Sequence, residues 1–251
     1  MPITSTDLVL YNAVNMPDAD GVTAGGAIDT LRRPDFTQIA ANDDIEAVSS
    51  AAGDTTQTVT IEGRDIAGNV VSETKMLTGT TPIVFSVIGV IERVLKAELS
   101  ATTTGSITVR RSVGGATLRV IPAGERGFLM FARKTSSDPS TTRNYYSKVF
   151  VKNTHGTLSL QNTTFRQNAD PDARITHLPA AVVDDTVTVA NRQTAPASGD
   201  TLDPDAFDDT DKSVGALAAG SAWAVWLRLQ LPAADPPHRS AYTLDVVGQS
   251  V

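Results

Sequence analysis

Hydrophobic and polar residues alternate most strictly between Ala222 and Leu231, in the stretch AWAVWLRLQL. Successive side chains of a β-strand point to opposite faces, so an apolar residue at every second position predicts a strand with one face on a core. A proline follows at Pro232, where a ladder of backbone hydrogen bonds has to stop. The apolar positions of this predicted strand are Trp223, Val225, Leu227, Leu229 and Leu231.

A second alternating region begins at Thr58 and predicts a β-hairpin. The run over residues 58–61 is followed by the turn sequence DIAGN at 65–69, and residues 70–77 return to a mixed apolar and polar pattern. Glycine and asparagine tolerate positive φ angles, which suits a tight turn between antiparallel strands. The stretch 87–99 fits two structures, because its apolar spacing is helical while β-branched residues dominate its first half. We interpret it as a strand.

These elements predict an all-β protein with two β-sandwich domains of the immunoglobulin-like or jelly-roll-like kind. Residues 1–53 have weak periodicity and many turn residues, so we expect an extended N-terminal arm that contains one short strand. We expect the first sandwich over residues 54–134 and the C-terminal sandwich over 145–251. The polar segment between them, 135–144, is expected to be a linker, with a long surface loop inside one domain as the alternative.

Charge and composition narrow the classes of partner. The 251 residues carry a net charge of −7, whereas a nucleic-acid-binding protein shows a basic surface, so we expect no nucleic-acid partner. The chain has no cysteine, which excludes disulfides, cysteine-liganded zinc and cysteine nucleophiles. Its most apolar window, 82–94, contains Glu92 and Arg93 and is too short to span a membrane. Because no leader pattern opens the sequence, we expect production in the cytoplasm and no membrane partner.

The sequence contains none of the familiar catalytic motifs: the nucleophile-elbow, phosphate-loop, dinucleotide-binding and zinc-protease patterns are all missing. The three histidines, His155, His177 and His238, each lie in an expected turn or near a proline. A Ser-His-Asp triad assembled from distant residues stays open as an alternative. We therefore expect a protein that is not an enzyme and has neither catalytic residues nor a cofactor.

An acidic loop precedes the strand at 222–231 and is the best candidate for a metal site. Residues 200–211 hold six aspartates, and clustered carboxylate oxygens are the ligands that calcium prefers. The EF-hand pattern fails, because Asp208 stands at its glycine position and Val214 at its final glutamate position. A solvated acidic loop is the alternative interpretation. The calcium candidates are Asp203, Asp205, Asp208, Asp209 and Asp211.

Trp226 lies on the face of the predicted strand opposite the core-facing Trp223. An exposed ring at this position would suit a carbohydrate-binding module, because such modules stack sugars on aromatic side chains. The chain is only 5% aromatic, which weighs against a sugar platform. A second buried layer or a subunit interface is the interpretation we favour for Trp226.

Two passages resemble virion proteins of tailed bacteriophages. The first passage, residues 59–109, opens on VTIEGRDIAGN and closes on GSITV, and it is similar to β-sandwich modules of phage head and tail components. The second starts at Lys148 with KVFVKNTHGTLSLQNTTF and ends on AGSAWAVWLRLQL. It is similar to phage structural proteins encoded near the capsid gene. The resemblance supplies no catalytic residues.

The resemblance implies a non-enzymatic structural protein of a phage particle, and we expect a capsid cement (decoration) protein. Such a protein would bind the major capsid protein on the exterior of the virion, and we expect it to form a homo-oligomer, as a trimer. An acidic protein suits that location, away from packaged DNA. A head–tail connector, a tail component and a carbohydrate-binding surface module are the alternatives. The residues expected at interfaces are Leu8, Tyr11, Met16 and Trp226.

Overall fold

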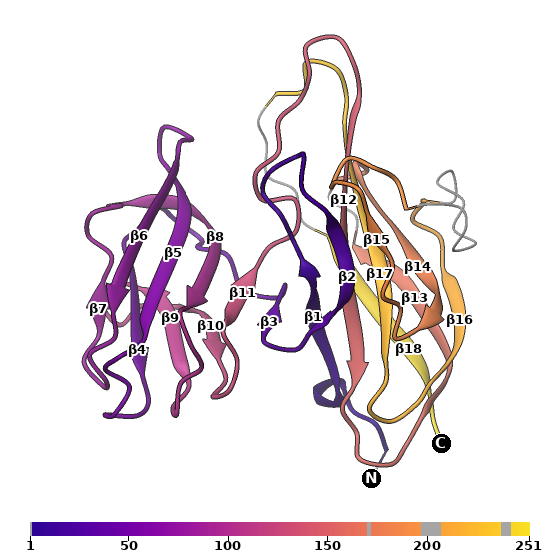
Figure 1. The fold of residues 1–251 in the computed structure, drawn as a ribbon, viewed down its shortest axis with the longest axis horizontal. Helices are drawn as coiled ribbons and strands as arrows, with labels where there is room; N and C mark the ends of the chain where they lie inside the picture. Colours follow the sequence, from indigo (N-terminus) through magenta and orange to yellow (C-terminus); the bar gives the residue numbers. More distant parts are fainter. Residues whose placement is uncertain (1, 170–171, 197–206, 237–241) are drawn as a thin grey trace. The chain divides into compact units, whose positions relative to one another are not determined.

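The computed structural model describes residues 2–169, 172–196, 207–236 and 242–251 (Figure 1). The structure is all-β, with 51% of residues in strands, and the described residues contain no α-helix. The alternation of apolar and polar residues accounts for this class, because it suits pleated strands with a face on a core. No helix among these residues has the length and apolar character needed to cross a membrane.

The chain forms two compact units, and the second is an insertion in the first. Unit 1 comprises residues 1–29 and 131–251, and unit 2 comprises residues 30–130. The predicted domain limits are therefore corrected. The expected linker at 135–144 belongs entirely to unit 1, and its last two residues already form part of a strand.

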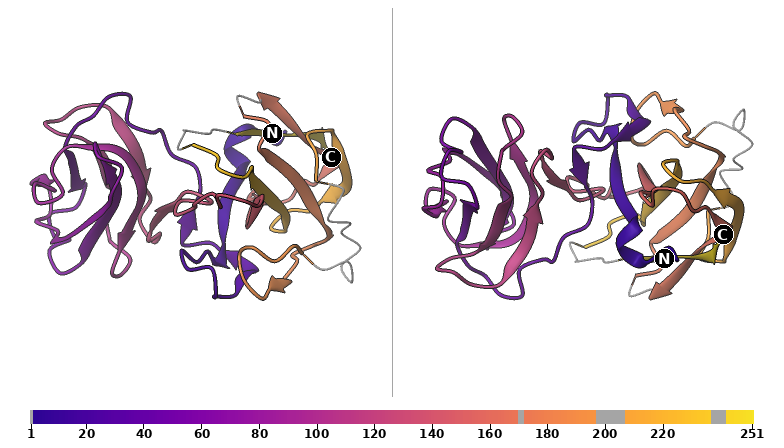
Figure 2. Two further views of the ribbon diagram at one scale, coloured as in Figure 1. Left: turned by 90° about the horizontal axis from the view of Figure 1, so that it is seen from above. Right: turned by 90° about the horizontal axis from the view of Figure 1, so that it is seen from below.

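Unit 2 contains two sheets in two layers, with the strand orders β10-β9-β4-β7 and β3-β11-β8-β5-β6 (Figure 2). All paired neighbours are antiparallel except β3 and β11. The predicted hairpin at 58–77 is confirmed, because β5 and β6 pair around the turn at 65–69. The strands are β3 (Arg32–Arg33), β4 (Ile45–Ser49), β5 (Thr58–Asp65), β6 (Val70–Met76), β7 (Ile83–Val84), β8 (Ile91–Leu99), β9 (Ile107–Arg111), β10 (Thr117–Ile121) and β11 (Gly127–Leu129).

The core of unit 2 is formed by aliphatic residues from both sheets. Val59 and Ile61 of β5 pack in one cluster with Ile45 of β4 and Val109 of β9, and all four are fully buried. The strand interpretation of the ambiguous stretch at 87–99 is confirmed by β8, which pairs with β5 and β11. Long-range pairing thus decides between two local patterns that the sequence leaves open.

Unit 1 contains a six-stranded sheet, β14-β17-β12-β1-β2-β15, and a three-stranded sheet, β16-β13-β18. A single turn of 3-10 helix over Ser5–Asp7 precedes the first strand. The strands of the larger sheet are β1 (Leu8–Asn15), β2 (Ala24–Asp29), β12 (Arg143–Asn153), β14 (Ile175–Val183), β15 (Thr188–Val189) and β17 (Ala222–Leu231). Those of the smaller sheet are β13 (Leu160–Ala169), β16 (Lys212–Leu217) and β18 (Thr243–Ser250).

Strand β17 is confirmed as a core strand, and both of its faces are buried. Val225 and Leu227 on its odd-numbered face form a cluster with Phe165 of the smaller sheet. Trp226 on its even-numbered face belongs to a separate buried cluster. On its two sides β17 pairs with β12 and β14. A central strand covered on both faces carries apolar residues at consecutive positions, as β17 does.

The prediction of an extended arm over residues 1–53 is wrong. Strand β1 lies inside the six-stranded sheet, where it pairs with β12 from Leu8–Asn153 to Asn12–Val149 and with β2 on its other side. Residues 45–49 form β4, which belongs to unit 2. Because the partner strand β12 begins only at Arg143, no local sequence pattern reveals where β1 is placed.

Candidate functional site

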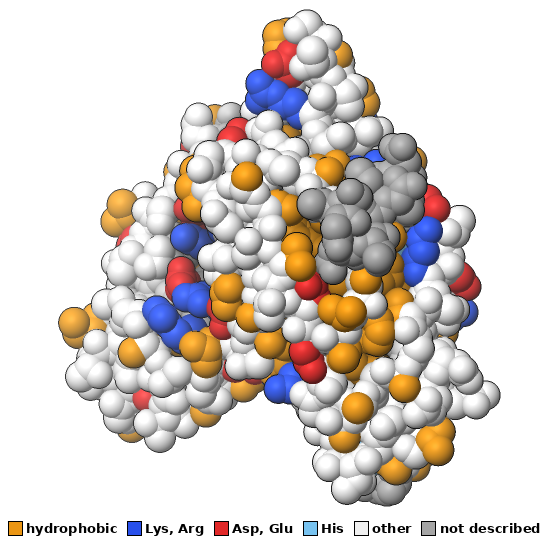
Figure 3. All heavy atoms as spheres, turned by 45° about the vertical axis from the view of Figure 1, so that its right-hand side comes forward, with side chains coloured by type: hydrophobic (Ala, Val, Ile, Leu, Met, Phe, Trp, Pro, Cys, Tyr) orange, Lys and Arg blue, Asp and Glu red, His pale blue; other side chains and the backbone are white. Residues whose placement is uncertain are grey.

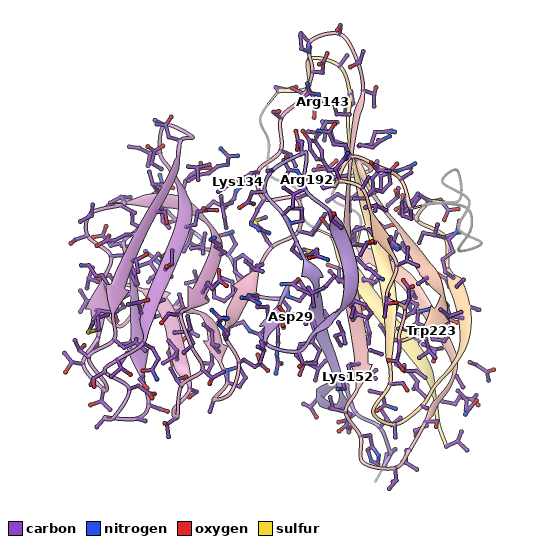
Figure 4. All side chains as sticks on the ribbon, in the orientation of Figure 1. Asp29, Lys134, Arg143, Lys152, Arg192 and Trp223 are labelled. Atoms are coloured by element: carbon purple, nitrogen blue, oxygen red, sulfur yellow. The ribbon has the colours of Figure 1, made fainter. Side chains whose placement is uncertain are left out.

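A pocket in unit 1 is lined by the end of β1 with its following loop, the first residue of β2, the segment at 132–133, the start of β12, and the loop after β15. Its lining includes Met16, Arg133, Tyr145, Tyr146 and Arg192. Figure 4 shows Arg192 and Lys134 near one another at this end of unit 1. The described lining has no histidine and no carboxylate, so it brings together no general acid or base.

The two arginines of the pocket are nearly buried, and each has a carboxylate partner. The Arg192 guanidinium lies 4.8 Å from the centre of the Tyr145 ring and donates a 2.7 Å hydrogen bond to Asp20. Arg133 lies 2.8 Å from Asp18 in an ion pair. These contacts fasten the loop between β1 and β2 to the segment that precedes β12 and to the loop after β15. Because both guanidinium charges are compensated, they leave little attraction for an anionic ligand.

Lys148 of β12 carries a charge into a fully buried face of the six-stranded sheet. Its side chain is 0% exposed, and its Nζ lies 2.5 Å from Oδ2 of Asp185, which is 2% exposed. A buried charge is stable only when it is paired and hydrogen-bonded, and this ammonium has further acceptors. It donates hydrogen bonds of 3.0, 3.1 and 3.1 Å to the main-chain carbonyls of Gly26, Asp185 and Val187.

His177 of β14 is buried beside Leu227 on the face of the larger sheet that meets the smaller sheet. Its Nδ1 forms a hydrogen bond with the Tyr242 hydroxyl. Burial and then the Lys212 ammonium lower the pKa of His177, against Asp208, which raises it. The folded chain therefore favours the neutral imidazole.

The structure covers only part of the predicted calcium loop, since Asp203 and Asp205 lie outside the described residues. Partial burial raises the pKa of Asp208, but hydrogen bonds from Lys212 and Thr210 outweigh it and bring the pKa to about 2. Lys212 lies 2.8 Å from this carboxylate. The described residues contain no group of three or more histidine or acidic side chains that could hold a metal ion, so Asp208, Asp209 and Asp211 form no such site by themselves.

The predicted interface residues lie mostly inside unit 1. Trp226 is 0% exposed and packs with Tyr146 and Phe207, so it is neither an interface anchor nor a sugar platform. Tyr11 is buried in the cluster of Phe150, while Leu8 is half-buried against the core between the sheets. Met16 is half-buried in the pocket lining. The buried layer, one of the two interpretations favoured for Trp226, is thus what the structure shows, and Tyr11 is buried in the same sheet because both of its faces are covered.

Sequence reasoning missed Lys148, Asp185 and the two pocket arginines. A signal for Lys148 is present in the sequence, because Tyr146, Lys148 and Phe150 share one face of an alternating strand. A lysine between two aromatic residues on one strand face indicates a charge held in an apolar layer. Asp185 and Arg192 lie in loops without periodicity, and only the tertiary structure brings them to their partners.

Comparisons with known proteins identify no relative: no family model, curated protein or solved structure matches this chain. The surface drawn in Figure 3 carries basic and acidic side chains interspersed with one another. Such a face lacks the one-sign field that attracts nucleic acid or an anionic membrane.

Proposed function

We propose that this chain is a non-enzymatic structural protein of a phage particle, and that it acts as a capsid cement (decoration) protein. Both units are taken as β-sandwich domains, and the major capsid protein and further copies of the chain are taken as its partners. The sequence resemblance to phage virion proteins supports this proposal. The insertion of unit 2 supports it as well. Two chain connections, at 29–30 and 130–131, join the units, so a mechanical force on the particle would be carried by two connections instead of one.

The observation that carries the proposal is a group of exposed apolar side chains on the loops at one end of unit 2. Ile66 is 70% exposed, Val90 is 47% exposed and Val113 is 92% exposed. Single exposed apolar residues are ordinary on protein surfaces, whereas several on neighbouring loop tips indicate a contact surface.

The register of the strands places these three loops at the same end. Asp65, next to the turn that holds Ile66, pairs with Ile91, which directly follows Val90. Ile91 also forms a β-bridge with Asp43. Asp43 in turn lies 2.5 Å from Arg111 in an ion pair, and Arg111 is the last residue of β9 before the loop that holds Val113. We call Ile66, Val90 and Val113 the apolar loop tips.

The apolar loop tips would add modest binding energy per copy, since burying one such side chain contributes about 1.5–3 kcal/mol at most. A cement protein works with contacts of this size, because the symmetry of the shell repeats each one many times. Many modest contacts then raise the barrier to opening of the shell.

The test measures shell stability and retention of the chain on purified particles. Shells that lack the chain are incubated with wild-type protein, with Ile66→Ser/Val113→Ser, or with the control Val182→Ser, an exposed valine of unit 1. Wild type and control should bind and raise the melting temperature of the shell, and the double variant should bind more weakly. Absence of the chain from purified virions would overturn the proposal.

Copy number separates this role from the alternatives in the same particle. A cement protein approaches the number of capsid subunits, whereas a head–tail connector or tail component is present only as a ring or a short stack. Quantitative mass spectrometry of purified virions measures this ratio. The carbohydrate-binding alternative loses its main support, because the Trp226 ring is buried.

A further inference from the structure

We propose that Lys148 and Asp185 condense to form an intramolecular amide bond inside unit 1. The first argument concerns hydrogen-bond geometry. A lysine ammonium has three N–H donors, and three main-chain carbonyls accept hydrogen bonds from Lys148 Nζ. Asp185 Oδ2 lies closer than any of them, at 2.5 Å, yet it has no hydrogen-bond partner. The nitrogen thus lies in direct contact with the carboxyl group while its hydrogen bonds go to main-chain carbonyls, and this contact places the two groups close enough to react.

The second argument concerns the fixed position of the Asp185 carboxyl group. Its other oxygen, Oδ1, accepts a 3.0 Å hydrogen bond from the Val187 backbone N–H. The preceding residue, Asp184, exchanges hydrogen bonds of 2.8 Å with Ala222 of β17, one through its backbone N–H and one through its side chain. The backbone therefore holds the carboxyl carbon beside the amine. Because the two groups are already positioned, the reaction avoids the large entropy loss of a bimolecular reaction.

The third argument concerns water. Both side chains are essentially inaccessible, at 0% and 2% exposure, and the rings of Phe150 and Trp226 lie 5.2 and 5.5 Å from Lys148 Nζ. Condensation of an amine with a carboxylic acid releases water. In aqueous solution the high concentration of water therefore opposes the reaction. An enclosed apolar site removes this opposition and also protects the amide from hydrolysis.

The reaction balances without any co-reactant. The Lys148 ammonium first transfers one proton to the Asp185 carboxylate, which leaves a neutral amine and a carboxylic acid. The nitrogen lone pair then forms the bond to Cγ of Asp185, and the acid hydroxyl leaves with a second proton from the nitrogen as water. The product is a secondary amide whose single N–H stays among the three carbonyls.

The bond would join β12 to the segment between β14 and β15, across 37 residues of sequence. It would close a covalent loop that contains β13 of the smaller sheet and β14 of the larger sheet, in a chain without cysteine. This inference stands apart from the proposed function, because it follows from one buried contact and holds in any structural role.

The intact mass of the denatured wild-type protein tests the proposal. The expected mass is one water molecule below that of the sequence, whereas the full sequence mass would overturn the proposal. Lys148→Met removes the nucleophile and should show its full mass. The control Lys152→Met, on the same strand, should still lose water.

Trypsin digestion locates the bond. An amide at Lys148 blocks cleavage after this residue, so peptide 144–152 should appear joined to peptide 175–192. Fragmentation of the joined peptides distinguishes Asp185 from its neighbour Asp184. Free peptide 144–148 as the dominant product, or a bond at Asp184, would contradict the assignment.

Discussion

At the residue scale, unit 1 holds ionisable side chains in its interior, and the charge state of each depends on the groups around it. Lys148 has a carboxylate and three carbonyls around its Nζ. His177 is buried and forms a hydrogen bond with the Tyr242 hydroxyl through Nδ1. A buried imidazole of this kind resists protonation, because its charged form loses the solvation of water and lies near the Lys212 ammonium.

The depressed pKa of His177 makes the stability of unit 1 depend on pH. The unfolded chain binds this proton more readily than the folded one, so stability falls as the pH drops below about 6.5, the usual histidine value. We expect the urea midpoint of the wild type to fall between pH 7 and pH 5. His177→Gln should flatten this slope.

Tryptophan fluorescence measures this midpoint, because both tryptophans lie in unit 1. The groups facing His177 are the Tyr242 hydroxyl, Asp208, Asp211 and Lys212. Asp208, with a pKa of about 2, stays ionised throughout the range. Equal slopes for wild type and variant would show that another group is responsible.

At the scale of the element, β17 organises unit 1 because it has strands on both sides and a buried cluster on each face. Its register with β12 runs from Lys152–Ala222 to Arg143–Leu231. The alternating pattern accounts for its odd-numbered face. The even-numbered face is apolar where the loop after β14 and strand β15 cover it, and Gln230 near the strand end is exposed.

Truncation of Trp226 should strongly destabilise unit 1. Trp226→Ala leaves a cavity next to Tyr146 and Phe207, and the loss of a buried aromatic side chain costs about 3–5 kcal/mol. The matched control on the same strand face, Gln230→Ala, should change stability by less than about 0.5 kcal/mol. Urea unfolding followed by far-ultraviolet circular dichroism compares the two. Similar small losses would mean that the second face contributes little to stability.

At the scale of the whole molecule, unit 2 has the features of an independent domain. Its core draws on both of its own sheets. Its chain enters and leaves side by side, because β3 and β11 pair in parallel at Arg32–Gly127 and Arg33–Phe128. An ion pair between Arg33 and Glu125 reinforces this closure. Domain insertions are tolerated where the two ends of the inserted unit lie close together.

The isolated segment 30–130 should therefore fold by itself. We expect a cooperative urea transition followed by circular dichroism, since all tyrosines and tryptophans lie in unit 1. The full chain should show the same transition in addition to the fluorescence change of unit 1. A gradual, non-cooperative change in the isolated segment would show that unit 2 needs the rest of the chain.

The sequence by itself determined the strands whose signals are local. The alternation at 222–231 predicts β17, and the turn at 65–69 between two alternating runs predicts the hairpin of β5 and β6. Both signals are local because side-chain direction and turn conformation depend only on neighbouring residues. They establish the all-β class and identify which residues of a strand share one face.

Tertiary structure alone decided which strands are neighbours and what covers each face. Strand β1 pairs with β12 far along the chain, so residues predicted as an arm form part of a central sheet. The covered second face decides between the buried layer and the interface that the sequence leaves open for Trp226, and it brings Asp185 to Lys148. A period of two residues specifies two faces of a strand, but the element that covers each face comes from distant sequence, which no local pattern encodes.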